Sequence, residues 1–437
     1  MPARGRTARD SGTTGTVIYR ARVSTPLPRA VRPRPAAALA AIGLAATLTA
    51  CGSSTPEAAP STTASTQTTP ASPSPRPSVD PTTACVENTL AEMDQGQRLG
   101  QLLMVGFDTN APQGALDELI GSEHVGNVIY LGGWEGAPKV SATSEHLQGL
   151  VSPTATADIG LMIAADQEGG EVHQLRGDGF TWPPSALEQG QMDPDALTEA
   201  ATGWAEEIKA VGVNVNLAPV ADTVPESLGR GNGPIGQWGR QYGYTPKTVE
   251  RGSVAFLEGM LAGGVEPTVK HFPGIGRITN NTDFFDTGIT DDQTGPDDPY
   301  LRPFQAGIDA GAGLVMVGSA YYSKLDPGVP AMFSEKIVTG LLREQMGFDG
   351  VVITDDVNAQ AVRQTPPAQR AVAVLRAGGD IVLTGDASVA TAMLDAVAAE
   401  AADDDEFADT VDAAVERVLR LKYRMGLLPC SSAAADD

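Results

Sequence analysis

Eight short apolar runs recur along the chain, and each ends in glycine or a polar residue. Helix-like segments rich in alanine, leucine and glutamate lie between most of the runs. Strands that alternate with helices predict a parallel sheet whose two faces are both covered. The predicted strands are Leu102–Phe107, Val125–Leu131, Leu161–Ala165, Val213–Ala218, Pro267–His271, Leu314–Val317, Val351–Thr354 and Asp380–Thr384.

This repeat favours an α/β fold of the (β/α)8 barrel type, built as one catalytic domain with loop insertions. The alternative is an open, doubly wound sheet. A dinucleotide-binding member of that class would show a glycine-rich turn after the first strand, and Gly106-Phe107-Asp108 contains no GxGxxG. The clearest helical segments are Pro194–Val211, Pro246–Gly263, Ser334–Met346 and Ser388–Ala401.

Polar residues follow several of the predicted strands directly. A single carboxylate after a strand is usually a helix cap, so one such residue carries little information. In a barrel, however, the carboxyl ends of all strands meet on one face, where active sites are built. The sequence therefore predicts one pocket formed from Asp166, Asp222, Lys270, His271, Asp355 and Asp356.

The first residues have the pattern of an export signal rather than of a fold. Arginines precede an apolar stretch at 36–50, which is short for a membrane span. Leu48-Thr49-Ala50-Cys51 resembles a lipobox, in which Cys51 is acylated and becomes the first residue of the mature chain. We expect a lipoprotein signal peptide at 1–50 and a protein anchored on the outer face of the cell membrane. An uncleaved anchor or a plain signal peptide is the alternative.

The remaining boundaries follow from composition. Residues 51–84 are mostly Ser, Thr, Pro and Ala, which favours a disordered tether because such a segment cannot bury enough apolar surface. The barrel domain is expected at 85–430, followed by a disordered tail at 431–437. Cys85 and Cys430 bracket this domain, and in an oxidising exterior they can form a disulfide. Two free thiols near the ends of the domain are the alternative.

Charge and residue usage exclude several classes of partner. The formal charge of −24 leaves little basic surface to neutralise phosphates, so no nucleic-acid partner is expected. Four histidines and three cysteines show no ligand spacing, so no metal is expected, and no cofactor is needed. We expect a monomer that meets the membrane only through its lipid.

Four motifs in the chain resemble one known family. They are Lys270–Gly274 (KHFPG), Asp166–Gly170 (DQEGG), Ala218–Asp222 (APVAD) and Phe348–Asp356 (FDGVVITDD). In this order, and on this pattern of strands, they resemble the family-3 glycoside hydrolases. The pattern is most similar to the single-domain bacterial β-N-acetylhexosaminidases, over roughly Gln97 to Leu427.

The resemblance implies a retaining glycosidase that acts on a small carbohydrate. Asp355 matches the family's catalytic nucleophile, and Asp356 matches a structural partner that binds backbone amides. The positions that match sugar-binding residues are Asp166, Arg240, Lys270 and His271. Each also has a purely structural interpretation: Asp355 could cap the following segment, Asp166 and Arg240 could pair with each other, and His271 could be a buried core imidazole.

The chain departs from the family at the proton donor. Where the relatives have an Asp-His pair after the fifth strand, this chain has Asn281-Thr282-Asp283. We expect Asp283 to act as the general acid, with a pKa raised by Phe284, Phe285 and Asp355. The alternatives are that Asp286 takes this role, that Asp283 only caps the loop, or that the loop no longer donates a proton and catalysis is slow.

The resulting prediction is an exo-β-N-acetylglucosaminidase that releases terminal GlcNAc from peptidoglycan fragments, with a muropeptide or another GlcNAc-glycoside as substrate. One alternative is β-glucosidase-type specificity, although such enzymes usually carry a second domain. The other is a catalytically weak, sugar-binding lipoprotein.

Overall fold

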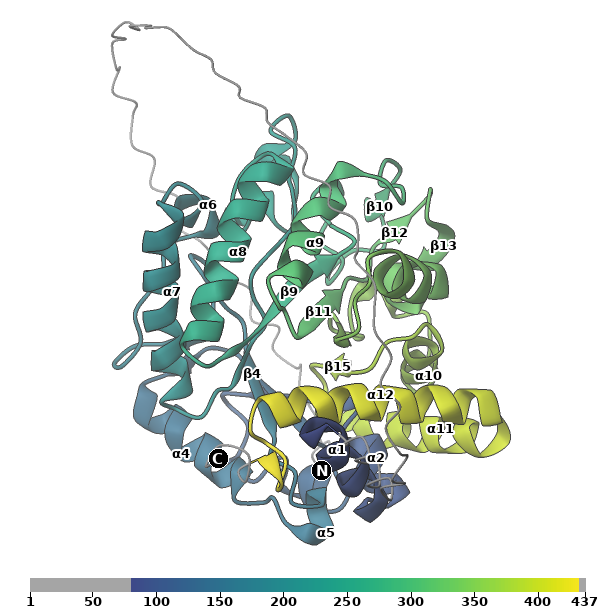
Figure 1. The fold of residues 1–437 in the computed structure, drawn as a ribbon. Helices are drawn as coiled ribbons and strands as arrows, with labels where there is room; N and C mark the ends of the chain where they lie inside the picture. The colour runs from purple at the N-terminus through teal and green to yellow at the C-terminus, as the bar shows by residue number, and fades with distance from the viewer. Residues whose placement is uncertain (1–79, 432–437) are drawn as a thin grey trace, which may run out of the picture. The chain divides into compact units, whose positions relative to one another are not determined.

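A computed structural model describes residues 80–431, and it contains the expected barrel (Figure 1). Eight parallel strands form one sheet, each close to a predicted run. They are β1 (Leu103–Asp108), β2 (Asn127–Leu131), β4 (Met162–Ala165), β8 (Val215–Asn216), β9 (Glu266–Phe272), β11 (Leu314–Val317), β14 (Val351–Thr354) and β15 (Val382–Thr384). The predicted α/β barrel class is therefore confirmed, and the open doubly wound sheet is excluded.

The order of the strands explains how the sheet closes. It runs β14-β11-β9-β8-β4-β2-β1-β15, so the last two strands along the chain lie at opposite ends of this order. A parallel bridge between Ile353 and Ile381 brings those two ends together. The Ile381 amide also donates to the Val352 carbonyl at 3.0 Å, and the Thr354 amide donates to the Ile381 carbonyl at 3.0 Å. The sheet is nearly closed, and the carboxyl ends of all eight strands share one rim.

A helix follows each strand and covers the outside of the sheet, as α7, α8 and α9 do in Figure 1. In α7, Asp193 caps the first turn, and buried residues such as Leu197, Ala201 and Ile208 repeat at helical spacing. This apolar stripe explains why the segment is a helix and which face it buries. The covering helices are α3 (Asp117–Gly121), α4 (Ala137–Gln148), α7 (Pro194–Lys209), α8 (Pro246–Ala262), α9 (Arg302–Asp309), the π-type helix η5 (Lys336–Gln345), α10 (Pro367–Arg376), α11 (Ala390–Asp403) and α12 (Asp405–Arg424).

Strand β9 is buried along its whole length and contains a bulge at its carboxyl end. Val315 of β11 pairs with Val269, but Val317 pairs with Phe272, so β9 carries one extra residue against its neighbour. The peptide bond between Lys270 and His271, within this extra stretch, is cis. A bulge re-aims side chains that regular alternation would send to opposite faces. It lies at the two residues of β9 that the sequence analysis placed in the pocket.

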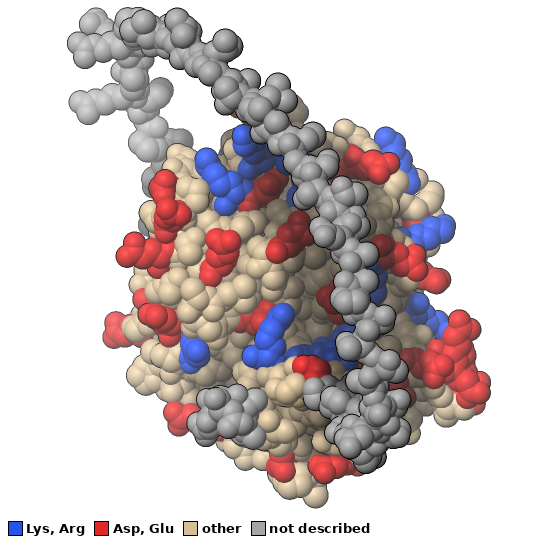
Figure 2. Space-filling model, in the orientation of Figure 1, with Lys and Arg blue, Asp and Glu red and all other residues tan. Residues whose placement is uncertain are grey.

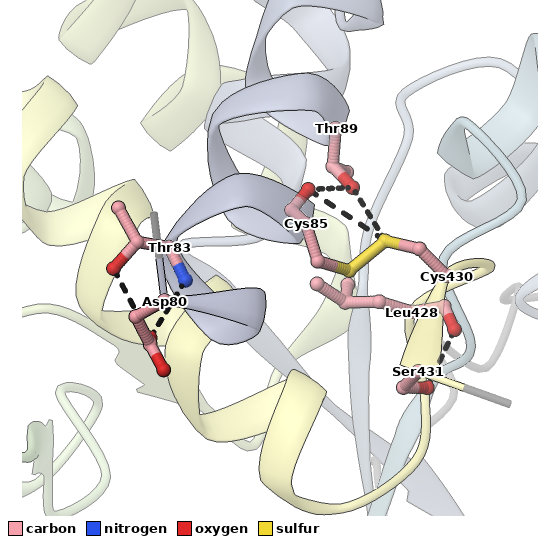
Figure 3. The surroundings of a disulfide bond; sticks show 7 residues. All are labelled: Asp80, Thr83, Cys85, Thr89, Leu428, Cys430 and Ser431. Carbon is pink, nitrogen blue, oxygen red and sulfur yellow. Dashed lines mark hydrogen bonds between the residues drawn. A yellow bond between two sulfur atoms is a disulfide. The ribbon is translucent and has the colours of Figure 1, made fainter. Parts of the chain in front are cut away.

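The first and last described helices close the opposite end of the barrel. Helix α1 (Pro81–Glu92) packs against α12, and a disulfide joins Cys85 of α1 to Cys430 beyond α12, with 5.9 Å between their Cα atoms (Figure 3). The amide of Gly160, just before β4, donates to the Leu427 carbonyl at 2.8 Å. The disulfide therefore lies at the amino ends of the strands, away from the predicted pocket.

Several predictions fall outside the described residues. The signal peptide at 1–50, the acylated Cys51, nearly all of the tether and nearly all of the tail lie in 1–79 and 432–437. Within residues 80–431, none of the helices combines the length and apolar character that crossing a bilayer requires.

Candidate active site

The strand-end residues from the sequence analysis meet at the carboxyl rim of the barrel. Asp166 follows β4 directly, and Asp355 follows β14 directly. Lys270 and His271 lie near the carboxyl end of β9. Strands β9 and β14 are separated in the sheet only by β11. Residues that are far apart in the chain are thus brought into one pocket.

A compact ion network occupies the β4–β9 side of this pocket. Lys270 Nζ lies 2.5 Å from Asp166 Oδ1 and 2.7 Å from Glu168 Oε1. Arg240 donates a hydrogen bond to each carboxylate oxygen of Glu168, from Nε to Oε2 at 2.8 Å and from Nη2 to Oε1 at 2.7 Å. Arg240 thus pairs with Glu168 rather than with Asp166. The side chains of Lys270 and Glu168 are 2% and 3% exposed, whereas that of Asp166 is 21% exposed. Asp166 is the most exposed member of this network and is therefore the most accessible to a ligand.

The network sets the charge state of its members. Burial alone would raise the pKa of Glu168, but the charges of Arg240 and Lys270 outweigh burial and lower this pKa to about 2. Burial alone would lower the pKa of Lys270. The negative charges of Asp166 and Glu168 outweigh burial, so the pKa of Lys270 is raised overall. The buried lysine and glutamate are therefore charged at neutral pH, and their ion pairs hold the Lys270 ammonium beside Asp166.

His271 is oriented by Asp222, which is fully buried. The Nδ1 atom of His271 lies 2.7 Å from Asp222 Oδ2, and the amide of Ile275 donates to Asp222 Oδ1 at 2.7 Å. Nε2 of the same ring is 3.4 Å from Nη2 of Arg240. One carboxylate thus fixes the imidazole and the start of the following loop together, which is a common way to orient a working histidine.

Asp355 and Asp356 take different environments although they are adjacent. The amide of Asp356 donates to Asp355 Oδ1 at 2.9 Å, which positions the Asp355 carboxylate. Asp356 Oδ1 accepts from the amides of Asn358 and Gly385 at 2.9 and 3.1 Å. Asp356 therefore connects the loop after β14 to the loop after β15. The second carboxylate oxygen of Asp355 accepts no hydrogen bond from the described residues.

The loop after β9 carries Asp283 across the rim to the β14 side. The amides of Thr279 and Asn280 both donate to the Gly288 carbonyl at 3.0 Å, which closes the base of the loop. At the tip, the amides of Gln360 and Ala361 donate to the carbonyls of Asp283 and Thr282 at 3.1 and 3.0 Å. These two bonds dock the tip onto the segment that follows Asp355.

The docked loop brings Asp283 into the field of Asp355. Loss of hydration among the surrounding protein atoms, followed by the negative charge of Asp355, raises the pKa of Asp283 to about 7, although the charges of Arg240 and His271 oppose the shift. Asp283 as a whole still exposes surface to water. Because Asp283 is exposed, water weakens the effect of burial, and the negative charge of Asp355 acts in the same direction and raises this pKa as well. Asp283 can therefore carry a proton near neutral pH.

Phe284 and Phe285, which we expected to help to desolvate Asp283, are themselves 72% and 48% exposed, so their rings project largely into solvent. The backbone turn explains the difference, because both of their amides donate to the Asn281 carbonyl and hold the tip out from the core. Asp286, the alternative acid, is also exposed, and no described residue engages its carboxylate.

Sequence reasoning gave no role to two residues that organise the site. Glu168 lies inside the DQEGG motif, and a signal was present, because two basic strand-end residues in one pocket need more than one buried anion. Asp222 was recognised as a strand-end carboxylate, but nothing local in the sequence identifies His271 as its partner. Within the part of the chain that the structure describes, no group of three or more His, Cys, Asp or Glu residues could hold a metal ion.

Comparisons with known proteins agree with this geometry. The model of the glycosyl hydrolase family 3 N-terminal domain matches residues 95–421. The β-hexosaminidase of Xylella fastidiosa (strain M23) is 37% identical over 249 residues, which cover 54% of this chain and 71% of that protein. The β-hexosaminidase of Stenotrophomonas maltophilia (strain R551-3) is 38% identical over 234 residues, which cover 51% and 66%.

Solved structures give the same result. The crystal structure of β-N-acetylhexosaminidase from Beutenbergia cavernae DSM 12333 is 47% identical, covers 76% of this chain and 98% of its own, and superposes with a TM-score of 0.73. A family 3 β-N-acetylglucosaminidase from Paenibacillus sp. str. FPU-7 is 30% identical, covers 77% of this chain and 63% of its own, and has a TM-score of 0.66. Because the family match spans well over half of the 437 residues, the chain belongs to glycosyl hydrolase family 3 and is a glycoside hydrolase.

Proposed function

We propose that the protein is a retaining exo-β-N-acetylglucosaminidase in which Asp355 is the nucleophile and Asp283 the general acid and base. The observation that carries this proposal is the pairing of two carboxylates with different roles at one rim. Asp355 is positioned by the Asp356 amide, and Asp283 has its pKa raised to about 7. Retaining glycosidases need such a pair, one group ionised and one protonated. The specificity for N-acetylglucosamine is supported by relatives named β-hexosaminidase.

The proposed hydrolysis has two steps, formation of a glycosyl ester on Asp355 and hydrolysis of that ester. An Asp355 oxygen attacks the anomeric carbon while Asp283 gives its proton to the glycosidic oxygen, so the leaving sugar departs as an alcohol and a glycosyl ester forms on Asp355. Asp283, now ionised, then takes a proton from a water molecule that attacks the same carbon. The ester breaks, Asp355 is released as carboxylate, and the sugar leaves with its original anomeric configuration.

The ion network supports the sugar in this scheme. Both carboxylate oxygens of Glu168 accept hydrogen bonds from Arg240, and one of them also pairs with Lys270. The role of Glu168 in this scheme is therefore to hold these two cations in place. Asp166 gives one oxygen to Lys270 and is partly open, so it can accept hydrogen bonds from sugar hydroxyls with charge assistance. Lys270, Arg240 and His271 complete the donors around the same sugar.

The decisive assay compares two chromogenic glycosides. Release of nitrophenol from the N-acetyl-β-glucosaminide, with at least about a hundredfold lower kcat/KM on the β-glucoside, supports the proposal, because a hydrogen-bonding site rejects a substrate that lacks its polar group. The reverse preference supports β-glucosidase-type specificity. Turnover of neither substrate, with N-acetylglucosamine binding retained, supports the sugar-binding lipoprotein.

We also propose that the enzyme is exported, anchored by lipid on Cys51, and acts on peptidoglycan fragments. The sequence before the barrel supports export and the lipid anchor, because a basic and apolar leader contains a lipobox-like Leu48-Thr49-Ala50-Cys51. Radiolabelled palmitate should enter the wild-type chain in the producing cell and be absent from Cys51→Ala. Equal labelling of the two chains, or no labelling of either, would contradict the anchor.

A further inference from the structure

The exposed large apolar side chains are distributed unevenly over the described residues. All five lie in segments that follow three neighbouring strands of the barrel, β4, β8 and β9, on the rim that holds the candidate active site. One of them, Trp238, ends the short 3-10 helix η2 (Gly236–Trp238), and the α-helices contribute none within residues 80–431. The five are Trp182, Trp238, Tyr244, Phe284 and Phe285.

Two of these rings stand beside the proposed acid. Phe284 and Phe285 follow Asp283 directly and are 72% and 48% exposed. Their exposure is built into the loop: their amides donate to the Asn281 carbonyl at 3.2 and 3.1 Å, and Thr282, 2% exposed, is buried beneath the tip. The turn and the buried Thr282 fix the backbone of the tip, and both rings stand exposed on it.

The position of the general acid determines which half of the substrate the residues next to it contact. A general acid lies at the glycosidic oxygen, and this oxygen belongs to the leaving group. Side chains at the tip of the acid's own loop consequently flank the leaving-group half of a bound substrate. A pyranose ring presents apolar C–H faces, so a flat aromatic surface next to that half can remove apolar area from water.

Charge indicates which ligands fit such a surface. The chain carries a net charge of −24, and in the view of Figure 2 blue and red side chains are interspersed without one large basic patch. Anionic membranes and nucleic acids bind through clustered lysine and arginine, so this balance disfavours both. A neutral sugar is not repelled.

We propose that Phe284 and Phe285 form a binding surface for the leaving-group sugar of a neutral, N-acetylated amino-sugar oligosaccharide. The proposal rests on the function proposed above, because Asp283 must be the acid for its neighbours to flank the leaving group. It makes the two phenylalanines specificity-determining residues, because they favour substrates whose leaving group is a sugar ring. They do not contribute to recognition of the other sugar, whose anomeric carbon reacts with Asp355.

The test uses the full-length chain and two substrates that differ in the leaving group. N,N′-diacetylchitobiose has a leaving-group sugar, whereas N-acetyl-β-glucosaminyl fluoride has none and needs no ring contact. For Phe284→Ala/Phe285→Ala, kcat/KM for chitobiose should fall about tenfold or more, mainly through KM, with the fluoride unchanged. Phe284→Tyr should retain the wild-type ratio of the two substrates, and Asp286→Ala is the control for a change at the loop tip.

A binding measurement separates this proposal from the proposed function. In Asp355→Ala, chitobiose affinity followed by tryptophan fluorescence should weaken about tenfold on adding the two Phe→Ala changes, while N-acetylglucosamine affinity stays the same. Equal losses on both substrates, or unchanged chitobiose binding, would overturn the aromatic surface while leaving the hydrolase intact. Wild-type turnover of neither substrate would overturn both. Binding to phosphatidylglycerol vesicles that disappears in the double Phe→Ala chain would identify a membrane surface instead.

Discussion

Asp283 and Asp355 repel each other across the rim of the barrel although they lie on loops that follow different strands, β9 and β14. Together with the loss of hydration at Asp283, this relationship raises the pKa of that carboxyl group to about 7, so that it can carry a proton near neutral pH. It also predicts how activity changes with pH, because the acid works only while Asp283 is protonated.

We expect kcat/KM for chitobiose to decline as pH rises through about 7, the pKa of Asp283, because the fraction of protonated acid falls about tenfold per pH unit above it. Removing the charge of Asp355 should lower the pKa of Asp283, since the repulsion that helps to hold the proton is lost. A titration of the Asp283 carboxyl by NMR in Asp355→Asn measures this shift without needing turnover. A titration at the same pH as in wild type would show that Asp355 does not control it.

Asp283→Ala should affect substrates according to their leaving groups. On chitobiose, whose leaving group needs a proton, kcat/KM should fall by about 100- to 10,000-fold. The loss on nitrophenyl N-acetylglucosaminide should be much smaller, because nitrophenolate departs unprotonated. Asp286→Ala, which removes an exposed carboxylate from the same loop, is the matched control and should be nearly silent. Equal losses on both substrates would rule out Asp283 as the acid.

Asp355→Ala should lower turnover of every substrate at least about a thousandfold, since no other group forms the glycosyl ester. The fold should survive, because Asp355 is partly exposed and supports only the Asp356 amide among the described contacts. The control is Asp349→Asn, an exposed aspartate just before the opposite end of β14. Circular dichroism and thermal melting verify the fold, and turnover near the wild-type rate would remove Asp355 from its role.

Glu168→Gln should destabilise the protein by about 3–5 kcal/mol, because it leaves Arg240 and Lys270 buried without their shared anion. The pKa of Glu168 is lowered on folding, so its contribution is present above the ordinary carboxyl pKa of 4.5 and is lost as pH falls toward 2. The difference in unfolding free energy between wild type and variant should therefore shrink in acid. Glu171→Gln, a nearby exposed residue, is the control, and a difference that stays constant with pH would contradict the ion network.

The disulfide should matter for stability and little for catalysis. Cys85→Ser/Cys430→Ser is expected to lower the unfolding free energy by about 2–5 kcal/mol, because the bond closes nearly the whole domain into one loop. Activity at 25 °C should be close to wild type, since the bond lies at the end of the barrel opposite Asp355. Chemical denaturation with and without reductant measures the first effect. An equally large loss of kcat in the folded variant would show coupling between the two ends.

The sequence was sufficient for the barrel because its signals are local. Each strand is a short apolar run, and several helices, such as α7, have a capping side chain and an apolar stripe. Position relative to a strand end therefore already indicates that Asp166, Lys270 and Asp355 share a rim. The partners of these residues were harder to predict. Glu168 meets Arg240 and Lys270 only after segments from three separate strands have assembled. The sequence indicated that the basic residues need a buried anion, but no local pattern identified Glu168 as that anion.

The loop after β9 shows the limit most clearly. Its composition suggested that Phe284 and Phe285 would bury Asp283, because aromatic residues are usually buried. In the structure both rings are exposed: a turn at the Asn281 carbonyl shapes the tip, and two backbone hydrogen bonds from the segment at 360–361 dock it where the loops after β9 and β14 meet. A docking contact between distant loops leaves no periodicity in either loop, so the sequence could suggest the acid but not the orientation of its neighbours.

The central claim, that Asp355 forms a covalent bond with the sugar, can be tested by trapping the intermediate. The full-length chain is incubated with an activated 5-fluoro N-acetyl-β-glucosaminide, which slows the second step, and the inactivated protein is analysed by intact mass and peptide mapping. We predict one added sugar per chain, located on Asp355. A sugar attached to another residue, or turnover without any adduct on Asp355, would contradict the account.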